Sequence, residues 1–205
     1  QTPEFGAIYP TPIIGMTGLV KSLDHVMTME FKGEGDFIIL IGETKEELGA
    51  SEYLDVIHDL VSGEVPELDL ELERKAQDYI LDIIRQGLVN SAHDLGDGGM
   101  AVALAESCIA GELGANISLD LDIRSDALLF GESQTRFMLS ADESATDKIV
   151  ELASQKGLEA AVIGRVTKSK QIIIHNLDAK LIDILVEDCK TSFTTSFDKL
   201  MKTDS

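Results

Sequence analysis

The order of apolar and polar positions predicts strands and helices that interleave along most of the chain. Between Asp69 and Val89, apolar residues recur every three or four positions with charges opposite them, which is the pattern of an amphipathic helix. The uninterrupted apolar run at 37–42 is typical of a strand covered on both faces. Other patterns predict strands at 13–20, 25–31, 116–121, 137–140, 160–166 and 171–175, a strand-like run at 128–130, and helices before Gly63 and at 100–111, 142–157 and 180–202.

The spacing of these elements bears on the fold class. Several predicted strands are joined by short connections, which favours an α+β fold over a doubly wound parallel sheet. We expect a mixed sheet with helices packed on one face, and the helices at 69–89 and 100–111 packed together over it. With 205 residues, the chain can form one sizeable core, or one domain with an attached piece of another.

The charge balance narrows the possible partners. Acidic residues outnumber basic ones by 37 to 17, which gives a formal charge of −20. Such a surface repels phosphate backbones and anionic lipid, so neither nucleic acid nor a membrane is expected as a partner. No apolar run is long enough for a transmembrane helix, and no secretory signal is evident. Cys108 and Cys189 lack a metal-binding spacing and indicate a reduced, cytoplasmic chain. The start at Gln1, inside strand-like sequence, indicates a fragment of a longer protein.

A glycine-rich turn leads into the helix at 100–111. It contains His93, Asp94, Asp97, Gly98 and Gly99. Glycines let the backbone come close to a ligand, and the N–H groups at the start of the helix can accept a phosphate. In this interpretation the aspartate next to the glycines caps the helix, while the histidine or its aspartate neighbour reaches a ligand. The alternative is an ordinary helix start with no ligand.

A second polar cluster, Glu132-Ser133-Gln134-Thr135-Arg136, separates two apolar runs. Its carboxylate, hydroxyl and amide can orient a polyol or an amide. No histidine is placed in sequence to activate Ser133, so the cluster supplies no nucleophile–base pair and we expect no catalytic residue in it. The alternative is a bulge or crossover in which Arg136 pairs with Glu132.

Four separated motifs together resemble one enzyme family. They are the run at 8–19 (IYPTPIIGMTGL), the segments at 41–44 and 48–53, Ser91–Asp94 with the stretch at 98–106, and the run at 129–137 (LFGESQTRF). In this order they resemble phosphoribosylformylglycinamidine synthase, whose large subunit contains two copies of a two-domain unit shared with aminoimidazole ribonucleotide synthetase. The sequence has Gly131 where that family often has serine, and Ala50 where it often has glycine.

The resemblance implies a domain division and an activity. Residues 1–35 would end an N-terminal-type, ATP-binding domain, and residues 36–205 would form the second C-terminal-type α+β domain. The family is a C–N ligase of purine biosynthesis: with ATP and magnesium it activates a formylglycinamide ribonucleotide, and glutamine-derived ammonia displaces the activated oxygen. The implied partners are the rest of the large synthetase subunit, a glutaminase subunit and a small accessory subunit.

The resemblance also implies what this chain lacks. The family's catalytic histidines and magnesium carboxylates would precede Gln1, so we expect the fragment to be inactive alone and to hold neither ATP nor magnesium by itself. Glu132, Ser133 and Gln134, with Arg136, would be the second-copy counterpart of a substrate-contacting motif and would face the non-catalytic, pseudo-symmetric site. Two alternatives stay open: a related ATP-using synthetase of the hydrogenase-maturation or selenophosphate synthase type, and a non-catalytic docking module.

Overall fold

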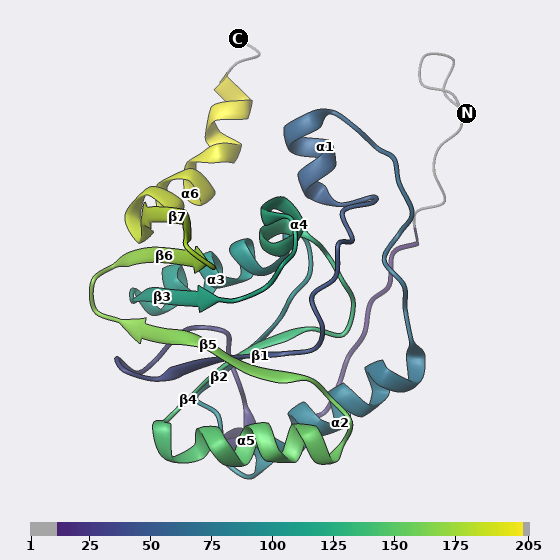
Figure 1. Cartoon of the computed structure of the whole chain (residues 1–205), viewed down its shortest axis with the longest axis vertical. Coiled ribbons are helices and arrows are strands. Elements are labelled where there is room, and N and C mark those ends of the chain that lie inside the picture. The colour runs from purple at the N-terminus through teal and green to yellow at the C-terminus, as the bar shows by residue number, and fades with distance from the viewer. Residues whose placement is uncertain (1–11, 203–205) are drawn as a thin grey trace.

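The protein is described by a computed structural model, which places residues 12–202. A single seven-stranded sheet forms its centre, in the order β2-β4-β1-β5-β3-β6-β7 (Figure 1). Strands β3 and β6 are parallel, and the other neighbouring pairs are antiparallel. The strands are β1 (Phe37–Ile41), β2 (Ser91–Asp94), β3 (Gly114–Leu119), β4 (Phe137–Ala141), β5 (Ala160–Thr167), β6 (Gln171–Asn176) and β7 (Ala179–Leu185).

Helices account for most of the remaining regular structure. None of those between residues 12 and 202 combines the length and apolar composition that a bilayer crossing requires. The predicted α+β class and the mixed sheet are confirmed. The helices are α1 (Glu52–His58), α2 (Leu70–Arg85), α3 (Gly99–Gly111), α4 (Ser125–Phe130), α5 (Glu143–Gln155) and α6 (Val186–Lys202), with a short 3₁₀ turn, η1, at Leu23–His25.

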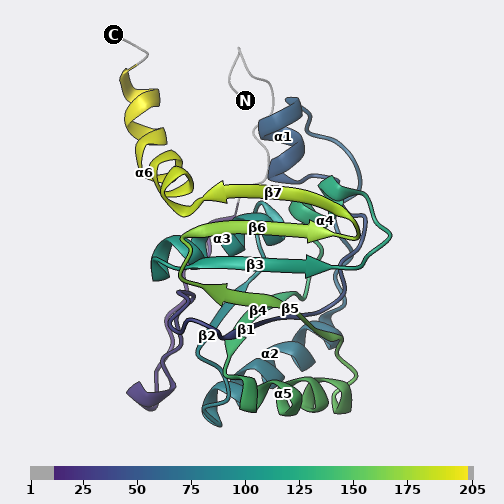
Figure 2. The same cartoon turned by 60° about the vertical axis from the view of Figure 1, so that its left-hand side comes forward.

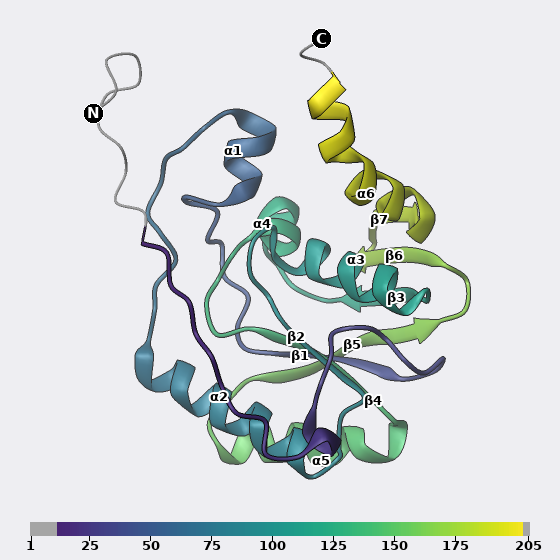
Figure 3. The same ribbon diagram turned by 180° about the vertical axis from the view of Figure 1, so that it is seen from behind.

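The helices cover both faces of the sheet, so the expectation of one covered face is wrong. Strand β1 shows the reason, because its successive side chains enter two different cores. Ile38 and Leu40 belong to the core under α3 and α4, whereas Ile39 and Ile41 belong to the core under α2 and α5. Figures 2 and 3 show these two helix layers on opposite sides of the strands. Helices α2 and α3 are therefore separated by the sheet and do not pack together as expected.

Helix α2 has the strongest pattern in the sequence, and its ends and packing follow from it. The Asp69 carboxylate accepts hydrogen bonds from the N–H groups of Glu71 and Leu72, at 2.9 and 3.0 Å. These bonds lower the pKa of Asp69, the Leu72 bond contributing most. At the buried face, the Tyr79 hydroxyl donates to the carbonyl of Ile149 at 2.8 Å and joins α2 to α5. Burial raises the pKa of Tyr79, so the phenol remains a donor at neutral pH.

The two strands expected at 13–20 and 25–31 do not form. Ile13 and Leu19 are 98% and 90% exposed, and the chain there has no regular structure apart from η1. An apolar run becomes a strand only where a neighbour supplies a ladder of hydrogen bonds, and here the described structure supplies only single bonds, such as that from the N–H of Ala92 to the carbonyl of Thr28. The segment joins the body at Phe31, which is 2% exposed and whose N–H donates to the carbonyl of Ser107.

Two further elements differ from the sequence prediction. Residues 180–185, expected as the start of a helix, lie in β7, in which Ile182 and Ile184 are opposite Ile174 and Ile172 of β6. The apolar run at 128–130 belongs to helix α4 instead of a strand. In both places a short apolar run fits either structure, and the packing partner decides which one forms.

The two cysteines differ in burial, which predicts a difference in reactivity. Cys108 is fully buried, and burial raises the pKa of its thiol to about 12. Cys189 is partly exposed, and burial raises its pKa less. Because the thiolate is the reactive form, we expect the folded protein to react with a disulfide reagent at Cys189 and the unfolded protein to react at both cysteines.

The measurement is a thiol titration at pH 8 with and without denaturant. The Cys189→Ala variant should lose the reaction of the folded protein. Equal rates for both thiols of the folded protein would contradict the burial of Cys108.

Candidate functional site

Three loops meet where the predicted motifs lie. Residues 131–136, here called the Glu132 corner, join α4 to β4. The loop at 42–51 joins β1 to α1, and the turn at 95–98 precedes α3. The backbone N–H of Glu132 donates to the carbonyl of Glu47, and the N–H of Lys45 donates to the Ser133 hydroxyl. The sheet and the helix starts therefore bring segments together that are far apart in the sequence.

The carboxylate of Glu132 connects the two predicted motifs. Its Oε1 accepts hydrogen bonds from the N–H of Gly98 at 2.9 Å and from the N–H of Glu52 at 3.0 Å. One donor lies in the turn before α3 and the other opens α1, where a negative charge is favourable because free N–H groups point outward. The glycine turn and the Glu132 corner thus form one wall of the molecule, while their contact with a ligand stays a prediction.

This arrangement leaves little capacity for a phosphate at the glycine turn. The N–H of Gly98 already donates to Glu132, and the N–H of Gly99 donates to the carbonyl of Gly96 at 3.0 Å. A phosphate there would also meet the carboxylate, at a cost set by like-charge repulsion. These two N–H groups are therefore already engaged within the chain, and within residues 12–202 no cluster of three His, Cys, Asp or Glu side chains is spaced for a metal ion. Whether the chain alone holds ATP or magnesium stays a prediction.

The start of α3 also differs from the prediction in its cap. The capping position is Gly98, in the left-handed conformation with φ of 78°, and no side chain bonds to the first turn. Asp97 is exposed, and the suggestion that it caps the helix is wrong. A residue with positive φ is favoured to be glycine, which explains the residue type at this position without a ligand.

Within the Glu132 corner, the side chains have different environments. Ser133 is 1% exposed, and its hydroxyl accepts from the backbone of Lys45 at 3.3 Å. Gln134 is exposed, and its amide nitrogen donates to the carbonyl of Glu132 at 3.2 Å. Both line a hollow of about 140 Å³ with Glu43 and other residues of the β1–α1 loop. Gln134 is therefore available to a ligand, whereas Ser133 supports the loop.

Arg136 holds the corner from inside. Its side chain is 1% exposed and donates to the carbonyls of Ser133 and Gly131 and to the hydroxyl of Thr44. Burial lowers the pKa of Arg136 to about 10, and the nearby carboxylates of Glu47 and Glu132 act in the opposite direction. The guanidinium therefore remains charged at neutral pH. The direct pairing with Glu132 considered from the sequence is wrong, because that carboxylate is engaged by backbone N–H groups.

His93 and Asp94 lie in β2 and not in a turn, and Asp94 is opposite Phe137, the residue that follows the Glu132 corner. The Nε2 of His93 is 2.9 Å from the Glu106 carboxylate, and its Nδ1 is 3.5 Å from Asp94. They line a separate hollow of about 360 Å³ with Phe137 at its side. Glu106 lies in the sequence motif at 98–106, but only the fold shows that it is the partner of His93. Any ligand role of this histidine stays a prediction.

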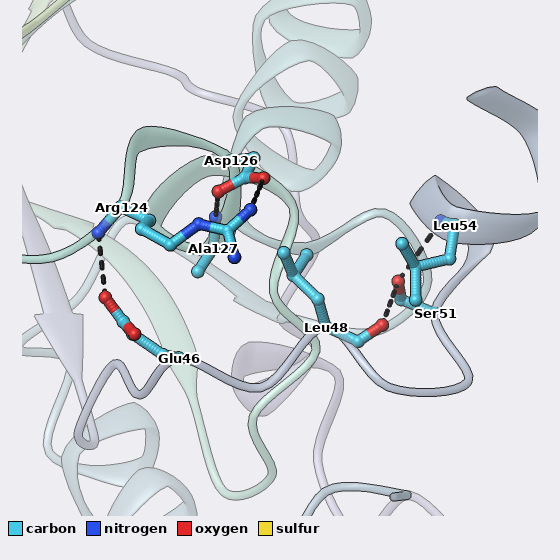
Figure 4. A network of polar contacts seen from close by, with 7 residues as sticks. All are labelled: Glu46, Leu48, Ser51, Leu54, Arg124, Asp126 and Ala127. Atoms are coloured by element: carbon cyan, nitrogen blue, oxygen red, sulfur yellow. Dashed lines mark hydrogen bonds and ion pairs between the residues drawn. The ribbon is translucent and has the colours of Figure 1, made fainter. Parts of the chain in front are cut away.

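A polar network fixes the β1–α1 loop that carries Glu47 and the α1 start (Figure 4). The Glu46 carboxylate accepts from the N–H of Arg124 at 3.0 Å, and Arg124 also pairs with Asp126 in the first turn of α4. The Ser51 hydroxyl donates to the carbonyl of Leu48 at 2.7 Å and accepts from the N–H of Leu54. The loop thus has a defined position beside the corner. In the sequence, the only indication that this loop belongs to the site is the family motif at 41–44 and 48–53.

Comparison with known proteins places this architecture in a family. Residues 33–175 match the model of the family described as AIR synthase related protein, C-terminal domain. Because the match covers most of the chain, the chain belongs to this family.

The curated relatives give a more particular similarity. The chain is 44% identical over 198 residues to the phosphoribosylformylglycinamidine synthase subunit PurL of Moorella thermoacetica, and 43% identical over 190 residues to that of Caldanaerobacter subterraneus. These alignments cover 97% and 93% of this chain but 27% and 26% of the relatives. The chain therefore spans about a quarter of the length of the curated relatives it matches. The resemblance stated from the motifs is confirmed.

Solved structures agree with the fold. Thermotoga maritima PurL complexed with FGAR aligns with a TM-score of 0.73 at 23% identity, over 82% of this chain and 30% of that chain. The same organism's PurL complexed with ATP gives 0.66 at 22% identity, over 82% and 27%. The hydrogenase maturation protein HypE of Escherichia coli gives 0.56 at 18% identity, over 78% and 51%. At these identities the similarity establishes the fold alone.

Proposed function

We propose that this chain is the C-terminal-type domain at the end of a phosphoribosylformylglycinamidine synthase subunit, a ligase of purine biosynthesis in the cytoplasm. The observation that carries the proposal is the 44% identity to a PurL subunit over 97% of the chain. The alternative of a hydrogenase-maturation synthetase has support at the level of the fold only, at 18% identity. Residues 1–35 would end the preceding ATP-binding domain, and residues 36–205 would form the domain itself.

In this proposal the domain supports and orients, while the rest of the subunit carries out the reaction. The full-length enzyme would use ATP and magnesium to activate formylglycinamide ribonucleotide. A glutaminase subunit would supply ammonia, and a small accessory subunit would assist assembly. A related assembly exists as the PurLQS structure of Thermotoga maritima. The Glu132 carboxylate, bonded to two backbone N–H groups, is already committed within the chain, which supports a structural role for this corner beside a second-copy site.

The proposal is tested by comparing the isolated chain with the full-length subunit. Ribonucleotide-dependent ATP hydrolysis should require the full-length subunit, and the 205-residue chain should show none. Robust turnover by the isolated chain would show that the catalytic residues have been misplaced. A full-length protein that hydrolyses ATP without any dependence on the ribonucleotide would contradict the assignment to this ligase.

A second experiment separates ligand binding from structural support within the corner. We expect Glu132→Ala in the full-length subunit to lower the free energy of unfolding by about 2 kcal/mol, because two N–H groups lose their acceptor. Gln134→Ala removes an exposed amide and should leave stability unchanged. Denaturation and steady-state kinetics are measured on both variants. A raised KM for the ribonucleotide in Gln134→Ala, at unchanged stability, would show direct substrate binding instead of support.

A further inference from the structure

Strands β3 and β5 separate from each other before either of them ends. Their pairing extends from Gly114 opposite Thr167 to Ile117 opposite Gly164. Beyond that point β5 continues along β1 as far as Ala160, and β3 continues along β6 as far as Leu119. Figure 2 shows the two strands diverging toward the end where β3 stops and β5 begins. Beyond this point, β3 and β5 of the described structure each have an unpaired edge that faces the other strand inside the sheet.

A register shift in β5 marks the point of separation. Ile38 lies opposite Gly164, but the next residue, Ile39, lies opposite Val162, so Ile163 is an extra residue in β5. A bulge of this kind bends its strand and increases the local twist. It directs the first half of β5 away from β3 while leaving the pairing with β1 intact. The separation is thus a built feature of the sheet and not a frayed end.

Backbone groups on both edges face the space between the strands. On β5, the carbonyl of Glu159 accepts from the N–H of Gly42, so by alternation the groups of Ala160 and Val162 point away from β1. On β3, the carbonyl of Leu119 accepts from the N–H of Leu177 on the β6 side, so the groups of Ser118 point away from β6. Within residues 12–202, no strand pairs with these edges on the side of the opening.

The opening is a groove of about 780 Å³. Its lining includes the apolar side chains of Val162, which is 43% exposed, and Leu121, which is 39% exposed. The lining also carries three carboxylates and, among residues 12–202, contains no lysine or arginine. The carboxylates are Glu43, Asp120 and Glu159. Glu43 lies 4.0 Å from Lys45, whereas the other two make no ion pair within the described part of the chain.

We propose that this groove, here called the β3–β5 groove, binds an extended polypeptide segment of a protein partner with alternating apolar and basic side chains. An extended segment offers the N–H and C=O groups that an open strand edge lacks, and its alternate side chains point to opposite sides. The apolar side chains would cover Val162 and Leu121, and the basic ones would meet Asp120 and Glu159. A nucleic acid or an acidic peptide would be repelled by the same carboxylates. This binding goes beyond the proposed ligase function and does not depend on it.

The test uses three short peptides labelled with a neutral dye and the 205-residue chain. The first alternates lysine and valine, the second alternates glutamate and valine, and the third is the lysine peptide with a central proline. Fluorescence anisotropy at low salt gives the dissociation constants. The lysine–valine peptide should bind, and the other two should bind at least tenfold more weakly, because charge and backbone N–H groups are both required.

A pair of charge-matched variants places the binding in the groove. The double variant Asp120→Asn, Glu159→Gln should weaken binding of the lysine–valine peptide about fivefold, as expected for two exposed ion pairs. The double variant Asp147→Asn, Glu187→Gln removes the same charge from exposed helix positions outside the groove and should change binding less than twofold. Thermal unfolding confirms that both variants fold.

Each other outcome overturns the proposal in a different way. Equal weakening by both double variants would show attraction by overall charge alone. Undiminished binding of the proline peptide would show that no strand is added. Absence of binding by the lysine–valine peptide at millimolar concentration would show that the groove takes no such segment. None of these results would affect the assignment to the ligase, which rests on the full-length activity.

Discussion

Replacing Arg136 with methionine is expected to lower the free energy of unfolding by about 3 to 4 kcal/mol. The methionine fills most of the space but leaves the carbonyls of Ser133 and Gly131 and the hydroxyl of Thr44 without their donor. Each buried polar group that loses its partner costs about 1 to 3 kcal/mol, and relaxation of the loop recovers part of the sum.

Two further variants make the measurement specific. Arg136→Lys keeps the charge but cannot reach all three acceptors, so we expect an intermediate loss. Arg165→Met removes an arginine that lies half exposed over the ring of Phe37, and this should cost less than about 1 kcal/mol. Urea unfolding gives the free energy of unfolding for the three variants. If Arg136→Met and Arg165→Met cost the same, the buried guanidinium does not hold the corner.

Replacing Gly99 with alanine is expected to lower the free energy of unfolding by about 3 kcal/mol or more, for two separable reasons. The first is conformational, because φ at Gly99 is +64° and an L-residue pays about 1 to 2 kcal/mol there. The second is steric, because an added Cβ would lie 2.5 Å from the carbonyl oxygen of Gly131 and 2.9 Å from the carbonyl carbon of Phe130. The start of α3 and the Glu132 corner would then have to move apart.

Gly87 provides a matched control for the steric part of the loss expected in Gly99→Ala. Its φ is +66°, close to that of Gly99, but no atom lies within 4 Å of an added Cβ. Gly87→Ala should therefore cost only the conformational part, about 1 kcal/mol. The difference between the two variants in urea unfolding measures the close approach itself. A difference near zero would mean that the glycine turn does not pack against the corner.

The sequence predicted best where the local pattern and the tertiary environment agree. The amphipathic run before Val89 formed α2, and the uninterrupted run at 37–42 formed the doubly covered strand β1. That same run already implied helices on both sides of the sheet, which conflicts with the one-face expectation made beside it. A strand without a polar face has no face to leave in water, so the two predictions could not both hold.

Other elements depend on partners that no local pattern contains. The apolar residues at 13–20 have the composition of a buried strand but meet no sheet edge in the described structure. The motifs identified the segments that form the site, but the sequence did not show which residues of these segments contact each other. The acceptor for Gly98 is Glu132, which lies 34 positions away, and the partner of His93 is Glu106 on the facing side of α3. These pairings arise only when the sheet brings the loops together.

The account depends most on the contact between the glycine turn and the Glu132 carboxylate, and nuclear magnetic resonance tests it directly. In spectra of the ¹⁵N-labelled chain, the Glu132→Ala variant should move the amide signals of both Gly98 and Glu52, because both N–H groups donate to the same carboxylate. The Gln134→Ala variant keeps that carboxylate and should move both signals far less. Movement of only one of the two signals, or equal movement in both variants, would show that the two motifs do not share this carboxylate and do not form one wall.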